Sequence, residues 1–318
     1  MATTSLKKLS DHEDLLSGGH AACPGCAGPV ILRQVLLAAQ QDDVYVAGSI
    51  ATGCMEVTTT VYPNSAWKVP MFHSAFENSA STISGMEAAY RSLKRQGKVD
   101  KDIRFIAFGG DGGTYDIGLQ ALSGALERGH NFTYVCYDNE AYMNTGIQRS
   151  GATPKGGYTN TAPAGQVEPG KREVKKDLTK ICAAHDIPYA AQASPHRARD
   201  LMKKVQKAVN IDGPCFINVF APCPRGWRYD PADSIQIAKL AADTCVWPIY
   251  EVEDGRVSVS YKPREKKSVE EWLKAEGRFK HLFKPGNEEL REEIQADIDR
   301  RWERLLEQER CDHAEDEE

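Results

Sequence analysis

Short apolar runs alternate with amphipathic segments along the first two thirds of the chain. The apolar runs predict buried strands, and the segments between them place their apolar residues at helical spacing. We expect strands within residues 42–50, 103–113, 132–142, 189–193 and 215–223, and helices within residues 29–41, 76–97, 114–130, 176–187 and 198–209. Strands alternating with helices in this way predict an α/β fold with a mostly parallel sheet.

The pattern changes at two places. Residues 152–172 are rich in Gly, Pro and Thr, and we expect a long ordered loop there, because the alternation resumes after it. From about residue 240 a hairpin-like stretch, residues 249–261, leads into charged helices. In the last helix one apolar stripe, expected to pack on its own domain or on a partner, is formed by Leu290, Ile294, Ile298, Trp302 and Leu305. We therefore expect an N-terminal arm at residues 1–19, the main α/β domain at 20–240 and a C-terminal extension at 241–318.

Composition and charge argue against a nucleic-acid-binding protein and against a membrane-spanning protein. Forty basic and 45 acidic residues give a formal charge of −5, so there is no basic excess to bind a nucleic-acid backbone. No apolar run is long enough to span a membrane, and the first residues lack the apolar core of a secretory signal. We therefore expect a cytoplasmic protein whose nine cysteines are reduced thiols.

Two of the predicted strands end in candidate ligands. Residues 110–113 read Gly-Asp-Gly-Gly and residues 138–141 read Asp-Asn-Glu-Ala. One strand–helix–strand crossover brings these ends side by side, where a carboxylate, an amide oxygen and a helix N-terminus suit Mg²⁺ and a phosphate. Taken alone, Gly-Asp-Gly is more often a tight turn with a capping Asp. A dinucleotide-binding fingerprint is excluded, because Tyr115 stands where its third Gly is required.

Four cysteines lie in turn-like contexts. Cys23 and Cys26 form a CxxC pair, Cys54 follows a Gly, and Cys223 precedes a Pro. A redox dithiol would be expected between a strand and a helix, which is not the pattern here. Four thiolates suit zinc or a [4Fe–4S] cluster equally well on spacing alone. We expect the remaining cysteines to be core or surface thiols: Cys136, Cys182, Cys215, Cys245 and Cys311.

The flanks of these motifs resemble a known family. Gly-Asp-Gly followed roughly 25 to 30 residues later by Asn is similar to the thiamine diphosphate motif, although the usual Asn-Asn ending is here Asp138-Asn139. The run DNEAYMNTGIQRS, with FENSAS, AWKVP, AHDIPYAA, APCPRGW and GRFKHL, resembles the β subunit of 2-oxoacid:ferredoxin oxidoreductases, the pyruvate synthase group, over about residues 15–310. The resemblance implies a thiamine diphosphate-binding fold, with a mostly parallel sheet flanked by helices and a C-terminal helical extension.

The resemblance also implies three neighbouring sites. The Mg²⁺ ligands would be Asp111, Asn139 and the backbone carbonyl of Ala141. The residues at the diphosphate and thiazolium, with Asn144 as the candidate catalytic residue, would be Gly110, Asp111, Gly112, Gly113, Asn139, Ala141, Asn144, Thr145 and Cys54. The ligands of a [4Fe–4S] cluster would be Cys23, Cys26, Cys54 and Cys223.

The implied reaction is a thiamine-dependent oxidative decarboxylation of a 2-oxoacid, most often pyruvate, to acyl-CoA and CO₂. Electrons would pass through the cluster to ferredoxin or a similar acceptor. The implied partners are an α subunit, which supplies the glutamate that activates the cofactor's aminopyrimidine ring, and γ and δ ferredoxin-like subunits. Oxalate, an aryl glyoxylate or a branched-chain 2-oxoacid are alternative substrates. A non-catalytic zinc-binding assembly subunit is an alternative of another class.

Overall fold

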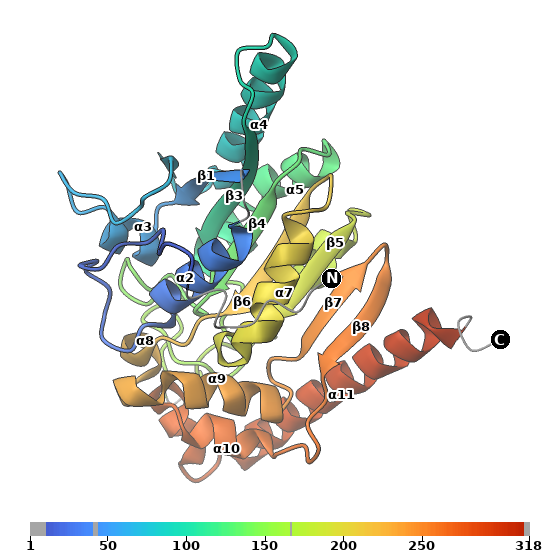
Figure 1. Ribbon diagram of the computed structural model, residues 1–318. Helices are drawn as coiled ribbons and strands as arrows, with labels where there is room; N and C mark the ends of the chain where they lie inside the picture. The colour runs from blue at the N-terminus through green and yellow to red at the C-terminus, as the bar shows by residue number, and fades with distance from the viewer. Residues whose placement is uncertain (1–10, 41–43, 166, 315–318) are drawn as a thin grey trace.

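One eight-stranded sheet organises the protein (Figure 1). The computed structural model describes residues 11–40, 44–165 and 167–314. The strand order is β2-β1-β3-β4-β6-β5-β7-β8. The strands are β1 (Val44–Ala51), β2 (Met71–Ser74), β3 (Asp102–Gly110), β4 (Thr133–Asp138), β5 (Tyr189–Ala193), β6 (Cys215–Phe220), β7 (Ile249–Glu253) and β8 (Arg256–Tyr261).

The sheet is mostly parallel, as the sequence predicts. Strands β1 to β6 pair in parallel, and β7 and β8 join them as an antiparallel hairpin beside β5. The hairpin expected at residues 249–261 thus continues the main sheet. The sequence did not predict β2, because it is a four-residue edge strand in which Phe72 and His73 are exposed.

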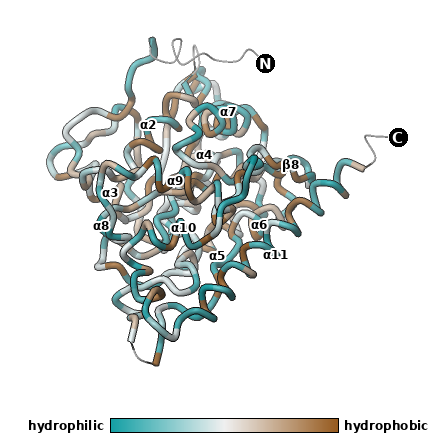
Figure 2. The backbone as a smooth tube through the Cα atoms, turned by 90° about the horizontal axis from the view of Figure 1, so that it is seen from below, coloured by the Kyte–Doolittle hydropathy of each residue, from teal (hydrophilic) through white to brown (hydrophobic). Residues whose placement is uncertain are grey.

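Helices cover both faces of the sheet. Figure 2 shows α2 (Ala27–Ala39) and α7 (Ala198–Ala208) on one side of the molecule, with α5 (Leu119–Glu127), α6 (Leu178–Ala183) and α11 (Glu288–Asp312) on the other. The other α-helices are α3 (Cys54–Thr59), α4 (Ser79–Arg95), α8 (Pro224–Trp227), α9 (Ser234–Asp243) and α10 (Val269–Lys274). Short 3-10 helices are η2 (Pro195–Arg197), η3 (Pro231–Asp233) and η4 (Gly277–Phe283), and a π-helix, η1, spans Gly112–Ile117.

Two short elements at the predicted site differ from the expected pattern. The helix expected at residues 114–130 begins earlier, as the π-helix η1, and continues as α5. The loop expected around Cys54 contains the six-residue helix α3. Neither is long enough to show a full amphipathic period, so periodicity alone could not find it.

The first and last described segments of the chain pack against this sheet and its helices. Residues 1–10 of the expected arm lie outside the described residues, but Leu16 is fully buried and forms an isolated β-bridge with Trp67. The stripe predicted on the last helix is confirmed to pack on its own chain, because Ile294 and Ile298 join one core cluster and Leu305 another. The domain boundary at residue 240 stays a prediction.

Candidate thiamine diphosphate site

The carboxyl ends of β3 and β4 lie side by side, as the crossover argument predicts. Gly110 pairs with Tyr137 in the parallel ladder, so Asp111 and Asn139 leave the sheet at the same edge. A cavity of about 270 Å³ opens there. The residues expected at the cofactor and Mg²⁺ all line it: Cys54, Gly110, Asp111, Gly112, Gly113, Asn139, Ala141, Asn144 and Thr145. Sequence reasoning missed five further lining residues: Gly53, Phe76, Tyr137, Tyr142 and Met143.

Three polar groups meet at the predicted Mg²⁺ position. The side-chain oxygen of Asn139 faces two other acceptors, Asp111 Oδ1 at 2.8 Å and the Ala141 carbonyl oxygen at 2.9 Å. Neighbouring oxygens around an octahedral Mg²⁺ are about 2.9 Å apart, because its bonds are about 2.0–2.1 Å long. The Asn139 oxygen lies at that spacing from the other two, so the three oxygens fit one face of a Mg²⁺ octahedron.

Asp111 is a buried carboxyl group whose ionised form is disfavoured by its surroundings. It is 1% exposed, and Ser150 Oγ donates to its Oδ2 at 2.5 Å. Burial raises the pKa of Asp111 well above its usual range, and the negative charges of Asp138 and Glu140 raise it further. A divalent cation would stabilise the carboxylate by replacing its lost hydration.

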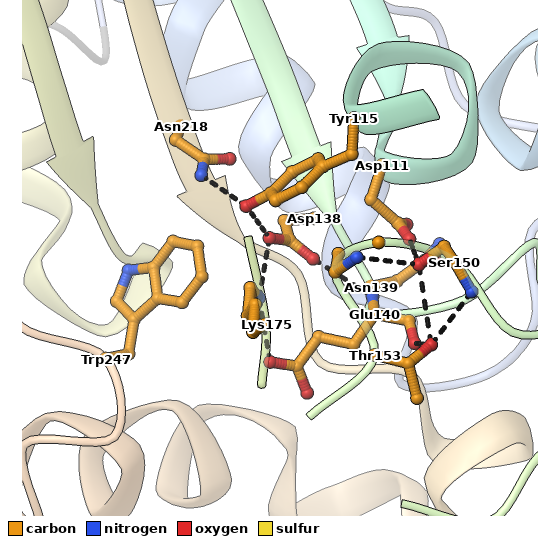
Figure 3. A network of polar contacts seen from close by, with 12 residues as sticks. Asp111, Tyr115, Asp138, Asn139, Glu140, Ser150, Thr153, Lys175, Asn218 and Trp247 are labelled. Carbon is orange, nitrogen blue, oxygen red and sulfur yellow. Dashed lines mark hydrogen bonds and ion pairs between the residues drawn. The ribbon is translucent and has the colours of Figure 1, made fainter. Parts of the chain in front are cut away.

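A buried ion-pair network supports the loop after β4 (Figure 3). Lys175 Nζ lies 2.7 Å from Asp138 Oδ2 and 2.9 Å from Glu140 Oε1, and 4.5 Å from the centre of the Trp247 ring. The Tyr115 hydroxyl also donates to Asp138. Lys175 lies three residues after the loop expected at residues 152–172, so the chain that leaves this loop places a cation beside Asp138 and Glu140.

Glu140 lies between two of the proposed Mg²⁺ ligands in a left-handed conformation, with φ of 65°. Arg278, from η4, pairs with Glu140 and with Glu276, the latter at 2.6 Å. Burial opposes ionisation, but the charges of Lys175 and Arg278 outweigh it and hold the pKa of Glu140 below its usual range. The Trp227 indole donates to the Asn139 carbonyl at 2.9 Å. The loop at residues 138–141 is therefore fixed from three separate parts of the chain.

The glycines leave no space for side chains at the start of η1. A Cβ on Gly112 would lie 2.6 Å from the Tyr142 ring, and one on Gly113 would lie 2.9 Å from the Phe76 carbonyl. Both glycines therefore let the backbone approach the cavity closely, as a diphosphate site requires.

The four candidate cysteines come together beside this cavity. Cys26 caps α2, Cys54 begins α3 and Cys223 caps α8, while Cys23 is exposed in the turn before Cys26. The Ala27 N–H donates to the Pro222 carbonyl at 3.3 Å, which ties the CxxC turn to the Cys223 loop. Gly25 closes that turn at φ of 70°, where a Cβ would meet the Pro231 carbonyl at 2.2 Å.

Burial raises the pKa of three of these thiols, those of Cys26, Cys54 and Cys223, whereas Cys23 is exposed. Burial raises the pKa of Cys26 to about 12, with further contributions from negative charge on Cys223 and Cys23. Burial and the neighbouring sulfurs raise the pKa of Cys54 in the same way. The Gly226 N–H donates to Cys223 Sγ at 3.3 Å. Within the described residues, no group of three or more His, Cys, Asp or Glu side chains is assembled as a ready-made metal site.

Comparisons with known proteins agree with this geometry. Residues 51–219 match the family described as thiamine pyrophosphate enzyme, C-terminal TPP binding domain. The chain is 53% identical to pyruvate synthase subunit PorB of Thermotoga maritima over 309 residues, which cover 95% of each chain. This chain belongs to the β-subunit family of the 2-oxoacid:ferredoxin oxidoreductases. The family resemblance expected from sequence is confirmed, and so is a thiamine diphosphate-binding fold in an oxidoreductase subunit.

Other relatives outline the breadth of the family. The chain is 50% identical to pyruvate synthase subunit PorB of Methanocaldococcus jannaschii over 90% of this chain and 95% of that one. It is 43% identical to ketoisovalerate oxidoreductase subunit VorB of Pyrococcus furiosus, over 92% of this chain and 93% of that one. A solved structure, 2-oxoglutarate:ferredoxin oxidoreductase from Magnetococcus marinus, shares the fold with a TM-score of 0.56 at 20% identity, over 71% of this chain and 79% of that one. Within the described ranges no helix is both long and apolar enough to cross a membrane.

Proposed function

We propose that the complex to which this β subunit belongs oxidises pyruvate, with coenzyme A and two one-electron acceptors, to acetyl-CoA, CO₂, a proton and two reduced acceptors. The support for pyruvate is the identity of 46–53% to seven relatives named pyruvate synthase subunits, against 43% to the ketoisovalerate relative. The structural observation that supports the site most strongly is that Asp111, Asn139 and Ala141 lie together at the ends of β3 and β4.

In this proposal Asp111, Asn139 and the Ala141 carbonyl hold Mg²⁺, and the backbone at Gly112 and Gly113 faces the diphosphate. Bound thiamine diphosphate supplies the carbanion that attacks the keto carbon and takes up the electron pair released with CO₂. The chain's own contribution is to orient the bound cofactor and substrate and to exclude water from the cavity. Phe76, Tyr142 and Met143 form the apolar wall of the cavity, and Asn144 and Thr145 offer polar groups at its edge.

We further propose that Cys23, Cys26, Cys54 and Cys223 ligate a [4Fe–4S] cluster. Each cysteine of such a cluster binds a different iron, so the ligands lie farther apart than they do around a single zinc ion. Cys54 supports this role most directly, since it lines the cofactor cavity and is also coupled to the other three thiols. A cluster there would accept electrons singly, next to the site where they are released.

The same proposal covers partners and location. We infer an assembly with an α subunit and with γ and δ ferredoxin-like subunits, with ferredoxin as acceptor, because the relatives are named as subunits. We place the complex in the cytoplasm, and the nine free cysteines support a reducing compartment.

The substrate is tested on the complex purified without oxygen. The chain is co-expressed with its partner subunits, and benzyl viologen reduction is followed with pyruvate, 2-oxoglutarate and 2-oxoisovalerate, each with and without coenzyme A. We expect the highest kcat/KM with pyruvate and a requirement for coenzyme A. A higher kcat/KM with either other acid would contradict the substrate assignment but not the family.

The cofactors are tested by composition. Asp111→Ala is expected to abolish thiamine diphosphate retention, measured by chromatography of the extracted cofactor. Cys223→Ser is expected to remove iron, acid-labile sulfide and the absorbance of the cluster, whereas Cys311→Ser, at an exposed thiol, retains them. Zinc in place of iron in the wild-type chain would restore the assembly-subunit alternative.

A further inference from the structure

Tyr137 carries a polar group that the proposed chemistry has not used. It is the penultimate residue of β4, is 2% exposed and lines the cofactor cavity. Its hydroxyl oxygen is buried, and no described residue accepts its hydrogen. The backbone N–H of Met55 lies close to this oxygen, but an N–H can only donate. Buried phenol groups nearly always find an acceptor, so one is missing here.

The hydroxyl points at the start of α3. Tyr137 belongs to the core cluster on the α2 side of the sheet, against which Cys26 and Cys54 pack. A Cβ built on Gly53 would lie 2.8 Å from the Tyr137 hydroxyl oxygen, and Gly53 directly precedes Cys54. Figure 1 shows α2, α3 and α8, whose first turns carry three of the four cysteines, on the same side of the molecule.

Two groups near this hydroxyl could accept its hydrogen: the sulfur of Cys54 or an atom of the bound cofactor. The hydroxyl lies against Gly53, the residue bonded to Cys54, with the Gly53 Cβ position 2.8 Å from its oxygen. This position favours the sulfur.

We propose that Tyr137 is a positioning residue whose hydroxyl donates a hydrogen bond to the Cys54 sulfur when the [4Fe–4S] cluster is bound. The inference rests on the proposed cluster and goes beyond it. Hydrogen bonds to cluster sulfurs stabilise the more negative, reduced state and so raise the reduction potential. The bond would therefore ease electron transfer at the one cysteine that faces both the cofactor and the cluster.

The test compares Tyr137→Phe with Tyr134→Phe in the assembled complex. Tyr134 lies on the same strand, is 3% exposed and places its hydroxyl 3.2 Å from Thr114 Oγ1. The cluster of this chain is assigned as the EPR signal that Cys223→Ser removes. In Tyr137→Phe, we expect an unchanged iron content, a more negative midpoint potential of that signal and a shifted iron–sulfur stretch by resonance Raman. Tyr134→Phe should leave the midpoint potential and the iron–sulfur stretch unchanged.

Three outcomes would overturn the inference. Equal potentials and Raman spectra in Tyr137→Phe and wild type would reject the hydrogen bond and leave the cluster intact. An unchanged potential with weaker thiamine diphosphate binding would assign the hydroxyl to the cofactor instead. An absence of iron from the wild-type chain would reject the proposed cluster and, with it, this role for Tyr137.

Discussion

At the scale of single residues, Glu140 holds the least expected position. A non-glycine residue in the left-handed region costs on the order of 1–3 kcal/mol and persists only when its surroundings determine it. Here Lys175 and Arg278 pair with the buried carboxylate from two sides. Because Glu140 stands between Asn139 and Ala141, fixing its backbone also fixes the direction of both proposed ligands.

We predict that Arg278→Met weakens Mg²⁺ and thiamine diphosphate retention. The substitution leaves Glu140 with one cationic partner, and breaking a buried ion pair typically costs about 3–5 kcal/mol. Cofactor content after gel filtration and the Mg²⁺ concentration needed for half-saturation measure the effect, with Tm recorded alongside. We expect Mg²⁺ half-saturation to rise by about tenfold or more, the equivalent of about 1.4 kcal/mol.

The control is Arg291→Met, which breaks an ion pair with Glu270 on the same C-terminal segment. It should lower Tm slightly and leave cofactor content unchanged. If Arg278→Met kept full cofactor content at wild-type Mg²⁺ affinity, the network would not position the loop.

The sequence could predict where the proposed ligands of this site lie but not their supports. Asp111 and Asn139 follow directly on apolar strands, so the edge rule for parallel sheets brings them together, and the family resemblance implies their role. Ser150 reaches Asp111 across 39 positions and Arg278 reaches Glu140 across 138. No spacing along the chain encodes such contacts, because they depend on how the loop after β4 and η4 pack in three dimensions.

At the scale of elements, α11 protects the free edge of the sheet. Glu309 accepts a hydrogen bond from the Val259 N–H, and Asp312 accepts one from the Val257 N–H, both at 2.8 Å. Edge strands with unpaired N–H groups invite pairing with other chains. The apolar stripe predicted for this helix indicated that it would pack, but no local pattern indicated that its acidic side chains would accept hydrogen bonds from the β8 backbone.

We predict that Glu309→Ala with Asp312→Ala destabilises the protein and promotes aggregation. Two buried or half-buried N–H donors lose their acceptors, at about 1–3 kcal/mol each. Thermal unfolding and light scattering on heating measure the outcome. Glu307→Ala, at an exposed position of the same helix, is the matched control and should change neither. Wild-type scattering from the double variant would show that the edge needs no such cover.

At the scale of the whole molecule, residues 241–314 complete the core of the preceding part. Trp227, from α8, lies in one cluster with Trp272 and Phe279, and the Arg278 guanidinium lies 4.1 Å from the centre of the Trp227 ring. Arg278 packs against this cluster and forms the buried ion pair with Glu140 in the loop after β4. The stability of the assembled fold should therefore depend on how that charge titrates.

Glu276 makes this dependence measurable. Burial raises its pKa from 4.5 to about 8, against the opposing charge of Arg278. The folded state thus binds a proton that the unfolded state has already released between these two values, so this group lowers the free energy of unfolding as pH rises through the window. At about 1.4 kcal/mol per pKa unit, the decrease amounts to several kcal/mol.

Glu276→Gln keeps the shape of the side chain and stays neutral. The difference in free energy of unfolding between this variant and wild type, measured in urea, should therefore grow in favour of the variant from pH 5 to pH 8. Glu271→Gln, at an exposed site on α10, should show no such growth. If the difference in free energy of unfolding between wild type and Glu276→Gln stayed constant across this range, Glu276 would be ionised in the folded protein throughout. Arg278 would then form ion pairs with two carboxylates, those of Glu140 and Glu276.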